Sequence, residues 1–425
     1  MYIKSEQIFD NIYAIEEALD SWIVYAPLSG SVLSCNTQDL TLLKQALAGQ
    51  TTNTDADTIA VELKNNEVQI SKNILTPSQF TKLSILSNYK CNLACSYCYS
   101  AKGRSNQEIS LAHLRAAINF FLGNASSGDK RSLFFSGGGE PLLSWRLLQP
   151  ALEEAIDKAC RNHIDLQIHF MTNGTIFNEE IASFFKTHGI SLCFSYEILE
   201  PIQNLLRGKS KIVARNLSQY LNNGNIIYIS STITPQSVSY MKEMVKAVAQ
   251  HFPGVNTITM EPVTGAELYG TPENLSQFYD EFDFNFKQAY TVAKSYGIQL
   301  NTSIQNITDH FVNRYCPGKF CLTPNGTFTI CHCASSPHEE RYEKCTYGYI
   351  DNDGNINFDI EKLNLLLSIN HNSYPECRDC FAKVHCGGEC MTRRDTYPPE
   401  FMAEVCNHTR KNVLSEIIKQ LHDEQ

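Results

Sequence analysis

The sequence predicts an α/β fold, with a partial (β/α)6 barrel between a small N-terminal α+β domain and a loop-rich C-terminal domain. Three observations support this prediction. The chain has 425 residues, which is enough for two or three domains. Strand and helix patterns alternate in its middle. Its 16 cysteines concentrate in residues 91–98 and 316–406. We therefore place the domains at residues 1–76, 77–300 and 301–425.

The first part combines short strands with one helix. Residues 21–27 and 31–34 predict a hairpin around Leu28-Ser29-Gly30. Residues 37–47 carry three leucines at helical spacing, and residues 58–63 are a further strand candidate.

The middle part alternates six strand candidates with helical patterns. Ser110 and Asn178 each precede an apolar helical stripe and are candidate N-caps. Right-handed crossovers would close such units into a partial barrel, whose function lies where the strands end. The strand candidates are residues 83–87, 133–136, 166–172, 190–196, 226–232 and 257–262.

Composition narrows the class of protein. The net charge is −10 and the basic residues are scattered, which argues against nucleic acid as the main partner. No apolar run reaches the length of a membrane span, and no signal peptide pattern opens the chain. We expect a cytoplasmic protein whose cysteines bind metal rather than form disulfides.

Three cysteines follow the first barrel strand. Cys91, Cys95 and Cys98 have the spacing C-x3-C-x2-C, with Tyr97 before the third. Four thiolates close an iron–sulfur cluster, whereas three leave one iron open to a substrate. Zinc is the alternative, but it needs a fourth ligand, and no Cys or His follows until His113.

Polar loops follow the next three strands. Gly138, Gly139 and Glu140 end the second, where glycines allow a ligand to approach the backbone and Glu140 could hold an ammonium group. A strained turn is the alternative. Asn173 ends the third strand, although Asn-Gly is also a common turn. Ser195 and Glu197 share a face at the end of the fourth.

An arginine follows the fourth strand. Arg207 is suited to bind a carboxylate in bidentate fashion, unless it is an ordinary surface residue.

Taken together, residues 80–300 resemble the radical S-adenosylmethionine enzymes. The resemblance implies that Cys91, Cys95 and Cys98 ligate a 4Fe–4S cluster whose open iron binds S-adenosylmethionine. It implies that Gly138, Gly139 and Glu140 line the amino group, and that Tyr97, Asn173, Ser195 and Arg207 lie near the cofactors. Residues 260–263 would flank the adenine. Family members often carry Asp-Gly where this chain has Glu197-Ile198.

The later cysteines follow the spacing C-x9-G-x4-C, then C-x2-C-x5-C-x3-C, then a last Cys. Residues 310–410 thereby resemble the SPASM domain, an iron–sulfur domain with two auxiliary 4Fe–4S clusters. The resemblance implies one cluster on Cys316, Cys321, Cys331 and Cys390, and another on Cys377, Cys380, Cys386 and Cys406, making three clusters with the first. Two zinc ions are the alternative, and Cys333 or Cys345 could replace an assigned ligand.

SPASM proteins mostly modify peptides or proteins. We expect a maturase that installs a crosslink, such as a thioether or carbon–carbon bond, in a ribosomally made peptide. Residues 1–76 would be a winged-helix-like domain that binds a leader peptide, and flavodoxin or ferredoxin would be the reducing partner. An anaerobic sulfatase-maturating enzyme is one alternative, although His332 stands where that branch has Asp. A non-catalytic iron–sulfur or zinc scaffold is another. Glu197, Glu261 and His332 are candidate acid–base residues.

Overall fold

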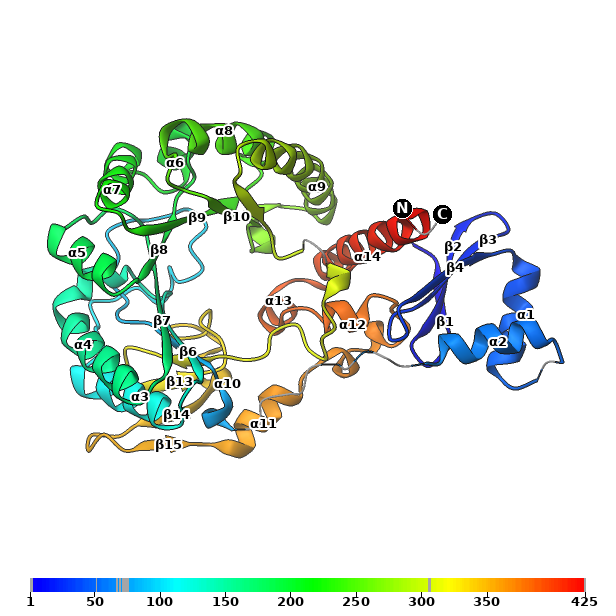
Figure 1. Cartoon of the computed structure of the whole chain (residues 1–425), viewed down its shortest axis with the longest axis horizontal. Coiled ribbons are helices and arrows are strands. Elements are labelled where there is room, and N and C mark those ends of the chain that lie inside the picture. The colour runs from blue at the N-terminus through cyan, green and yellow to red at the C-terminus, as the bar shows by residue number, and fades with distance from the viewer. Residues whose placement is uncertain are drawn as a thin grey trace.

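The structure is a computed structural model. It describes residues 3–423, apart from residues 51, 66, 67, 69, 71–75, 305 and 306. A curved sheet with helices along its outer side forms the larger part of the molecule, and a small sheet domain lies at the other end (Figure 1). Among the described residues, no helix is long and apolar enough to cross a membrane.

Seven parallel strands build the curved sheet, and the six that the sequence predicts are confirmed. They run side by side in chain order, as expected for consecutive β/α units. The strands are β5 (Lys82–Ile85), β6 (Lys130–Phe135), β7 (Asp165–Thr172), β8 (Ser191–Ser195), β9 (Ile226–Ile233), β10 (Thr257–Pro262) and β11 (Gln299–Asn301).

Helices cover the outer face of this sheet (Figure 1). Ser110 and Asn178 cap two of them as predicted, because their side chains accept hydrogen bonds from first-turn backbone N–H groups. The helices are α3 (Leu111–Gly123), α4 (Trp145–Arg161), α5 (Glu179–Thr187), α6 (Glu200–Leu206), α7 (Ser210–Asn222), α8 (Met241–His251) and α9 (Pro272–Ser295).

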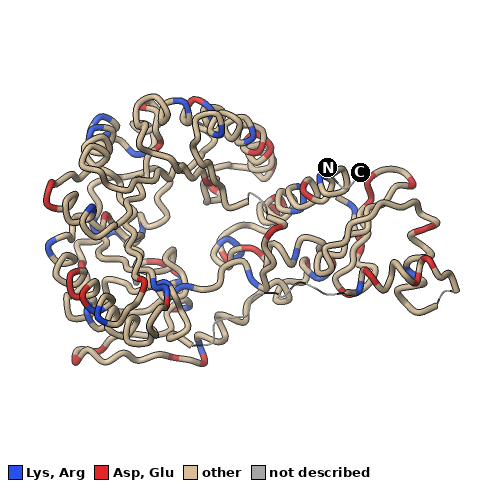
Figure 2. Tube along the Cα trace, viewed as in Figure 1, with Lys and Arg blue, Asp and Glu red and all other residues tan. Residues whose placement is uncertain are grey.

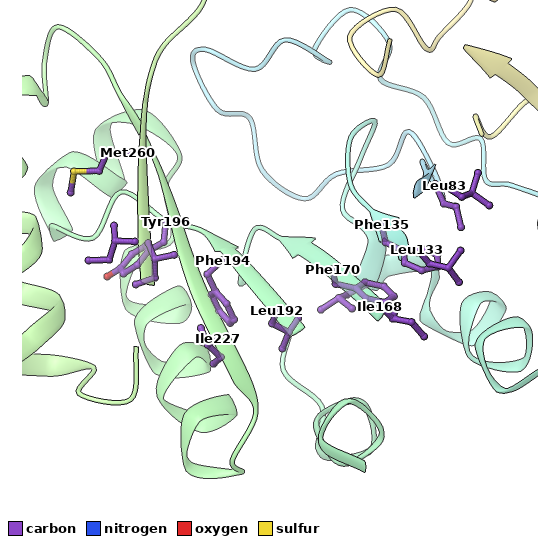
Figure 3. Close-up of a cluster of buried hydrophobic side chains, with 14 of the residues drawn as sticks. Leu83, Leu133, Phe135, Ile168, Phe170, Leu192, Phe194, Tyr196, Ile227 and Met260 are labelled. Carbon is purple, nitrogen blue, oxygen red and sulfur yellow. The ribbon is translucent and has the colours of Figure 1, made fainter. Parts of the chain in front are cut away.

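The core lies between sheet and helices. Leu83, Leu133, Phe135, Phe170 and Leu192 are fully buried there. Figure 3 shows these side chains in a row along neighbouring strands. Because strand side chains alternate, the residues between them face the concave side of the sheet. That concave face is where a substrate can enter.

The C-terminal part adds strands to the same sheet, and the sequence analysis did not predict these strands. β12 (Phe320–Leu322) pairs in parallel with β5 and covers its edge. β13 (Thr327–Thr329), β14 (Thr346–Ile350) and β15 (Ile356–Phe358) continue it antiparallel. The helices here are α10 (Tyr342–Cys345), α11 (Ile360–Ser368), α12 (Lys383–Cys386), α13 (Met391–Thr396) and α14 (Pro399–Asp423).

The N-terminal part is a four-stranded antiparallel sheet of β1 (Ser5–Phe9), β2 (Ile12–Ala18), β3 (Ser21–Ala26) and β4 (Ser31–Cys35). The predicted hairpin is β3–β4, and the predicted helix is α1 (Thr37–Leu47). The strand predicted at residues 58–63 is wrong. Asn53 caps α2 (Thr54–Leu63), whose Ala56, Ala60 and Leu63 pack at helical spacing.

The N-terminal sheet packs directly on the cysteine-rich region. One face carries α1 and α2, and the other packs against Phe381, Ala382 and two apolar residues of α14. The Tyr25 hydroxyl lies 2.6 Å from His385 Nε2, and both residues are buried. Figure 2 shows acidic and basic residues interspersed along the whole chain, without a basic stripe.

We expect Tyr25→Phe to loosen this domain contact. The substitution leaves the buried Nε2 of His385 without its partner, which costs about 1–3 kcal/mol. The free energy of unfolding measured with denaturant should fall by that amount, whereas Tyr290→Phe, at an exposed position on α9, should leave it unchanged. Equal stability of the two variants would contradict a stabilising role for the Tyr25 hydroxyl.

Candidate active site

The three cysteines of the first motif lie in the loop after β5, beside the loop after β7. The loop lines a cavity of about 510 Å³ together with Arg104. Arg104 donates a hydrogen bond to Cys98 Sγ at 3.0 Å. Asn173 Nδ2 lies 3.6 Å from Cys91 Sγ, so the structure brings these two predicted site residues together. Such N–H donors stabilise the sulfur ligands of an iron–sulfur cluster.

The thiol groups do not form a compact site for one ion. Within the described part of the chain, no three Cys, His, Asp or Glu side chains are placed to hold a metal ion together. The thiolates of a 4Fe–4S cluster each bind a different iron and therefore need not converge on one point. The arrangement is compatible with a cluster.

The two predicted glycines hold the cysteine loop against β6. A Cβ on Gly139 would lie 1.8 Å from the Lys90 carbonyl oxygen, and one on Gly138 would lie 2.5 Å from that of Asn88. Gly139 N donates to the Asn88 oxygen at 2.9 Å, and Glu140 N donates to the Lys90 oxygen at 2.7 Å. The glycines are needed here because two backbone segments touch.

The Glu140 carboxylate is buried and faces protein donors. Oε1 accepts from Leu142 N at 3.1 Å and from Thr172 Oγ1 at 2.8 Å, and Oε2 accepts from Asn173 N at 2.6 Å. Burial raises the pKa of this carboxyl group, which the hydrogen bonds oppose. Glu140 thus joins the ends of β6 and β7 beside the cysteine loop. Its predicted contact with an ammonium group remains a prediction.

A buried network joins Tyr97 to Glu197 and Arg207. The Tyr97 hydroxyl donates to Glu197 Oε1 and accepts from Arg207 Nη1 at 2.8 Å. Arg207 Nη1 also lies 3.5 Å from Glu197 Oε1, and their side chains are 10% and 0% exposed. Arg207 is therefore not the solvated surface residue of the alternative interpretation. Its Nε is buried and has no hydrogen-bond partner among the residues that the structure describes.

Ser195 and Ile198 lie in the chain on either side of Glu197. Ser195 ends β8 and pairs with Ser230 of β9, on the concave side. Ile198 takes φ 63°, a left-handed conformation that is rare for a β-branched residue and easy for glycine. Position 198 is where family members often carry glycine.

The second set of late cysteines surrounds Arg394. Its Nη2 lies 3.4 Å from Cys377 Sγ and 3.8 Å from Cys406 Sγ. Burial raises the pKa of the Cys377 and Cys386 thiol groups, and Cys380 and Cys406 lie close enough to both to raise it further. The structure thereby brings together the four cysteines that were assigned to one auxiliary cluster.

The first set is less evenly arranged. Cys321 faces the same side of the sheet as Ser84, and burial raises the pKa of its thiol to about 12. Cys331 interacts with Cys390 and lies close enough to Cys333 for a hydrogen bond between their thiol groups. Cys316 lies near the Arg314 guanidinium, as does Cys390. Cys333 therefore lies directly beside the assigned ligand Cys331.

Sequence reasoning missed three residues of this region. Arg104 and Arg394 donate to cysteine sulfurs, and the Tyr99 ring lies 5.4 Å from the ring of His332. Tyr99 connects the first cysteine loop with the first auxiliary set. The only sequence signal for Arg104 and Arg394 is that each lies near cysteines in the chain. That pattern is too common to identify these two arginines.

Comparison with known proteins assigns the class. The sequence model of the radical SAM superfamily matches residues 85–258. Residues 85–258 are therefore similar to the radical SAM enzymes, whose chemistry uses a 4Fe–4S cluster and S-adenosylmethionine. Similarity to the proteins described below extends over most of the chain.

Three curated relatives carry the sequence similarity. Uncharacterized protein MJ0804 of Methanocaldococcus jannaschii is 29% identical over 224 residues, 51% of this chain and 63% of that protein. Radical SAM cyclopropyl synthase TigE of Paramaledivibacter caminithermalis is 21% identical, covering 77% and 71% of the two chains. A serine-type anaerobic sulfatase-maturating enzyme of Klebsiella aerogenes is 25% identical, covering 34% and 36%.

Two solved structures share the fold. AnSMEcpe with bound AdoMet has a TM-score of 0.60 at 17% identity, covering 81% of this chain and all (100%) of that one. Streptococcus suis SuiB bound to precursor peptide SuiA has a TM-score of 0.57 at 13% identity, covering 93% and 98%. The α/β prediction is thereby confirmed.

Proposed function

We propose that this protein is a radical SAM maturase that installs a crosslink or related modification in a ribosomally made peptide. The single observation that carries the proposal is the cysteine loop at the barrel mouth, held by Gly138 and Gly139 and contacted by Asn173. The reduced cluster would cleave S-adenosylmethionine to a 5′-deoxyadenosyl radical, which abstracts hydrogen from the peptide. The residues of the protein would bind the cluster, S-adenosylmethionine and the peptide and orient them for this reaction.

Cys91, Cys95 and Cys98 would hold the cluster. A cavity of about 270 Å³ beside Tyr97, lined by Leu206, Pro235 and Val263, has the apolar character that suits an adenine ring. The unpartnered Nε of Arg207 is available to a carboxylate. Ser195 would lie near the ribose or methionine group.

Two auxiliary clusters would bring the number of 4Fe–4S clusters to three. Arg394, beside Cys377 and Cys406, supports the second set, and the contacts of Cys331 support the first. Eight thiolates for two clusters would leave neither cluster with an open iron, which suits electron transfer. Flavodoxin or ferredoxin would reduce the enzyme.

The N-terminal domain would bind a leader peptide. Helices cover both faces of its sheet, so β1 and β4 are the edges to which a peptide could add as a strand. SuiB, whose structure contains its precursor peptide, shares the fold of this chain. The winged-helix-like character of the domain stays a prediction.

The sulfatase-maturating alternative draws support from the Klebsiella relative. Against it stands His332, where that branch has an aspartate. Burial, together with Lys319 and Lys82, lowers the pKa of His332 to about 3, so this imidazole is neutral near pH 7. A protein-scaffold role would require neither the glycine contacts nor the buried arginine network.

The activity test is anaerobic. After reconstitution with iron and sulfide and reduction with dithionite, added S-adenosylmethionine should yield 5′-deoxyadenosine. Cys95→Ala should abolish the nucleoside while the auxiliary iron stays bound, because Cys95 lies outside both late cysteine sets. A protein with about two zinc ions, no iron and no nucleoside would instead be a zinc scaffold.

If the neighbouring genes encode a short Cys-rich or aromatic-repeat peptide, that peptide is the substrate to add in the assay. A mass change in this peptide that depends on S-adenosylmethionine would support the proposal. Conversion of a sulfatase-derived peptide instead would favour the alternative.

A further inference from the structure

A large cavity lies between the barrel and the C-terminal part. It has a volume of about 1020 Å³ and is lined by residues of both, including Ser84, Glu261 and His332. His332 contacts Tyr99, which directly follows Cys98 of the first cysteine loop. The cavity therefore lies next to the candidate active site, and the assigned cluster ligands Cys316 and Cys386 also line it.

Two lysines lie side by side on the wall of this cavity. Lys82 directly precedes Leu83, Lys319 directly precedes Phe320, and Leu83 and Phe320 are register partners on parallel strands. Leu83 and Phe320 point into the helix-covered core, so the lysines point to the opposite face, and both line the cavity. The Lys82 ammonium group lies 4.0 Å from the centre of the Phe134 ring.

Neither lysine has a carboxylate partner among the residues that the structure describes. The other charged residues of the lining are already occupied. Arg393 pairs with Glu389 at 3.0 Å, and Glu261 accepts hydrogen bonds from Ser303 N and Oγ at 2.7 and 2.6 Å. The two ammonium groups on this wall thus have no carboxylate as a counter-charge among the described residues.

Two neighbouring ammonium groups that are partly buried and lack a carboxylate partner would bind an anion favourably. Burial and the neighbouring charge of Lys319 lower the pKa of Lys82. Lys319 is two residues from Cys321, so the thiolates of a bound cluster would offset part of its charge. Lys82 lies on β5, a strand that carries none of the assigned ligands, and is the principal candidate.

We propose that Lys82, with Lys319 beside it, binds a carboxylate of the peptide substrate, so that the enzyme selects peptides with an acidic group near the modified residue. This inference rests on the peptide-modifying function proposed above. A carboxylate could come from an Asp or Glu side chain or from the peptide's C-terminus, and both offer the same two acceptor oxygens.

The test measures peptide binding to the reconstituted, full-length protein without S-adenosylmethionine. Three probes are compared by calorimetry under anaerobic conditions: Ac-Gly-Gly-Glu-Gly-Gly-NH₂, its Gln counterpart, and the Gln peptide with a free C-terminal carboxylate. We expect one of the two acidic probes to bind about tenfold more tightly than the neutral one. The better acidic probe identifies the source of the carboxylate.

Lys82→Met should remove this tenfold preference, because it keeps the length of the side chain and deletes the charge. Lys287→Met, at an exposed position on the outer helix α9, should retain the preference. Equal affinity for all three probes, or an undiminished preference in Lys82→Met, would overturn the proposal. An enzyme that forms 5′-deoxyadenosine but shows no preference would refute only the carboxylate site, whereas absence of the nucleoside would refute the proposed function.

Discussion

Gly139→Ala is expected to abolish formation of 5′-deoxyadenosine and to remove about one cluster's iron from the reconstituted protein. The new Cβ would lie 1.8 Å from the Lys90 carbonyl oxygen and 2.2 Å from Asn88 Oδ1. The Lys90 carbonyl group cannot withdraw without breaking the hydrogen bond from Glu140 N that holds the cysteine loop. The loop must therefore move, at a cost of about 3 kcal/mol.

A matched glycine separates this effect from a general effect of alanine. A Cβ added to Gly123, the last residue of α3, would have no heavy atom within 4 Å, and the φ of Gly123 is not left-handed. Gly123→Ala should keep full iron content and activity. Iron analysis and electron paramagnetic resonance of the reduced proteins provide the measurement. A Gly139→Ala protein with all of its iron would show that the close contact is not needed to hold the cluster loop.

Glu197→Gln is expected to destabilise the folded protein by about 3–5 kcal/mol. The substitution keeps the shape of the side chain but leaves the buried Arg207 guanidinium without its counter-charge. Hydrogen bonds from Ser231 Oγ at 2.7 Å and Thr232 N at 3.0 Å, which now meet a carboxylate, would also weaken. Denaturant unfolding gives the free energy directly.

A double-mutant cycle identifies the cause. Glu197→Gln combined with Arg207→Met removes both charges, and it should be more stable than Glu197→Gln alone because no unpaired charge remains buried. Glu200→Gln on α6 is the surface control, since Glu200 is 55% exposed and its partner Lys211 is 3.9 Å away; it should change stability by less than about 1 kcal/mol. Additive effects of the two core substitutions would contradict a direct interaction between Glu197 and Arg207.

The repeating units of the barrel could be predicted well from sequence. Their signals are local: strands such as β10 (Thr257–Pro262) are short apolar runs, and Ser110 and Asn178 are N-caps that act within one turn. Residues 58–63 misled because β-branched and apolar residues alternate within what is a helix. There the cap at Asn53 and the packing of Ala56, Ala60 and Leu63 on the sheet decide the structure.

The grouping of the site residues could be predicted only in part. The loops after β5, β6 and β7 were expected to meet, because parallel strands end at the same edge of the barrel. That Glu140 would accept from Thr172 and Asn173, and that Arg207 would pair with Glu197 and Tyr97, depends on side chains from different strands. No spacing along the chain contains that information.

The cysteine motifs, the order of the β/α units and the glycines after β6 can be read from the sequence alone, because each is a short pattern with a local physical cause. The packing of β12 on the edge of β5, and of the N-terminal sheet on α12 and α14, is visible only in the folded molecule. The same holds for the cavity wall that Lys82 and Lys319 share. These contacts join residues more than two hundred positions apart, and they depend on which surfaces can be buried together.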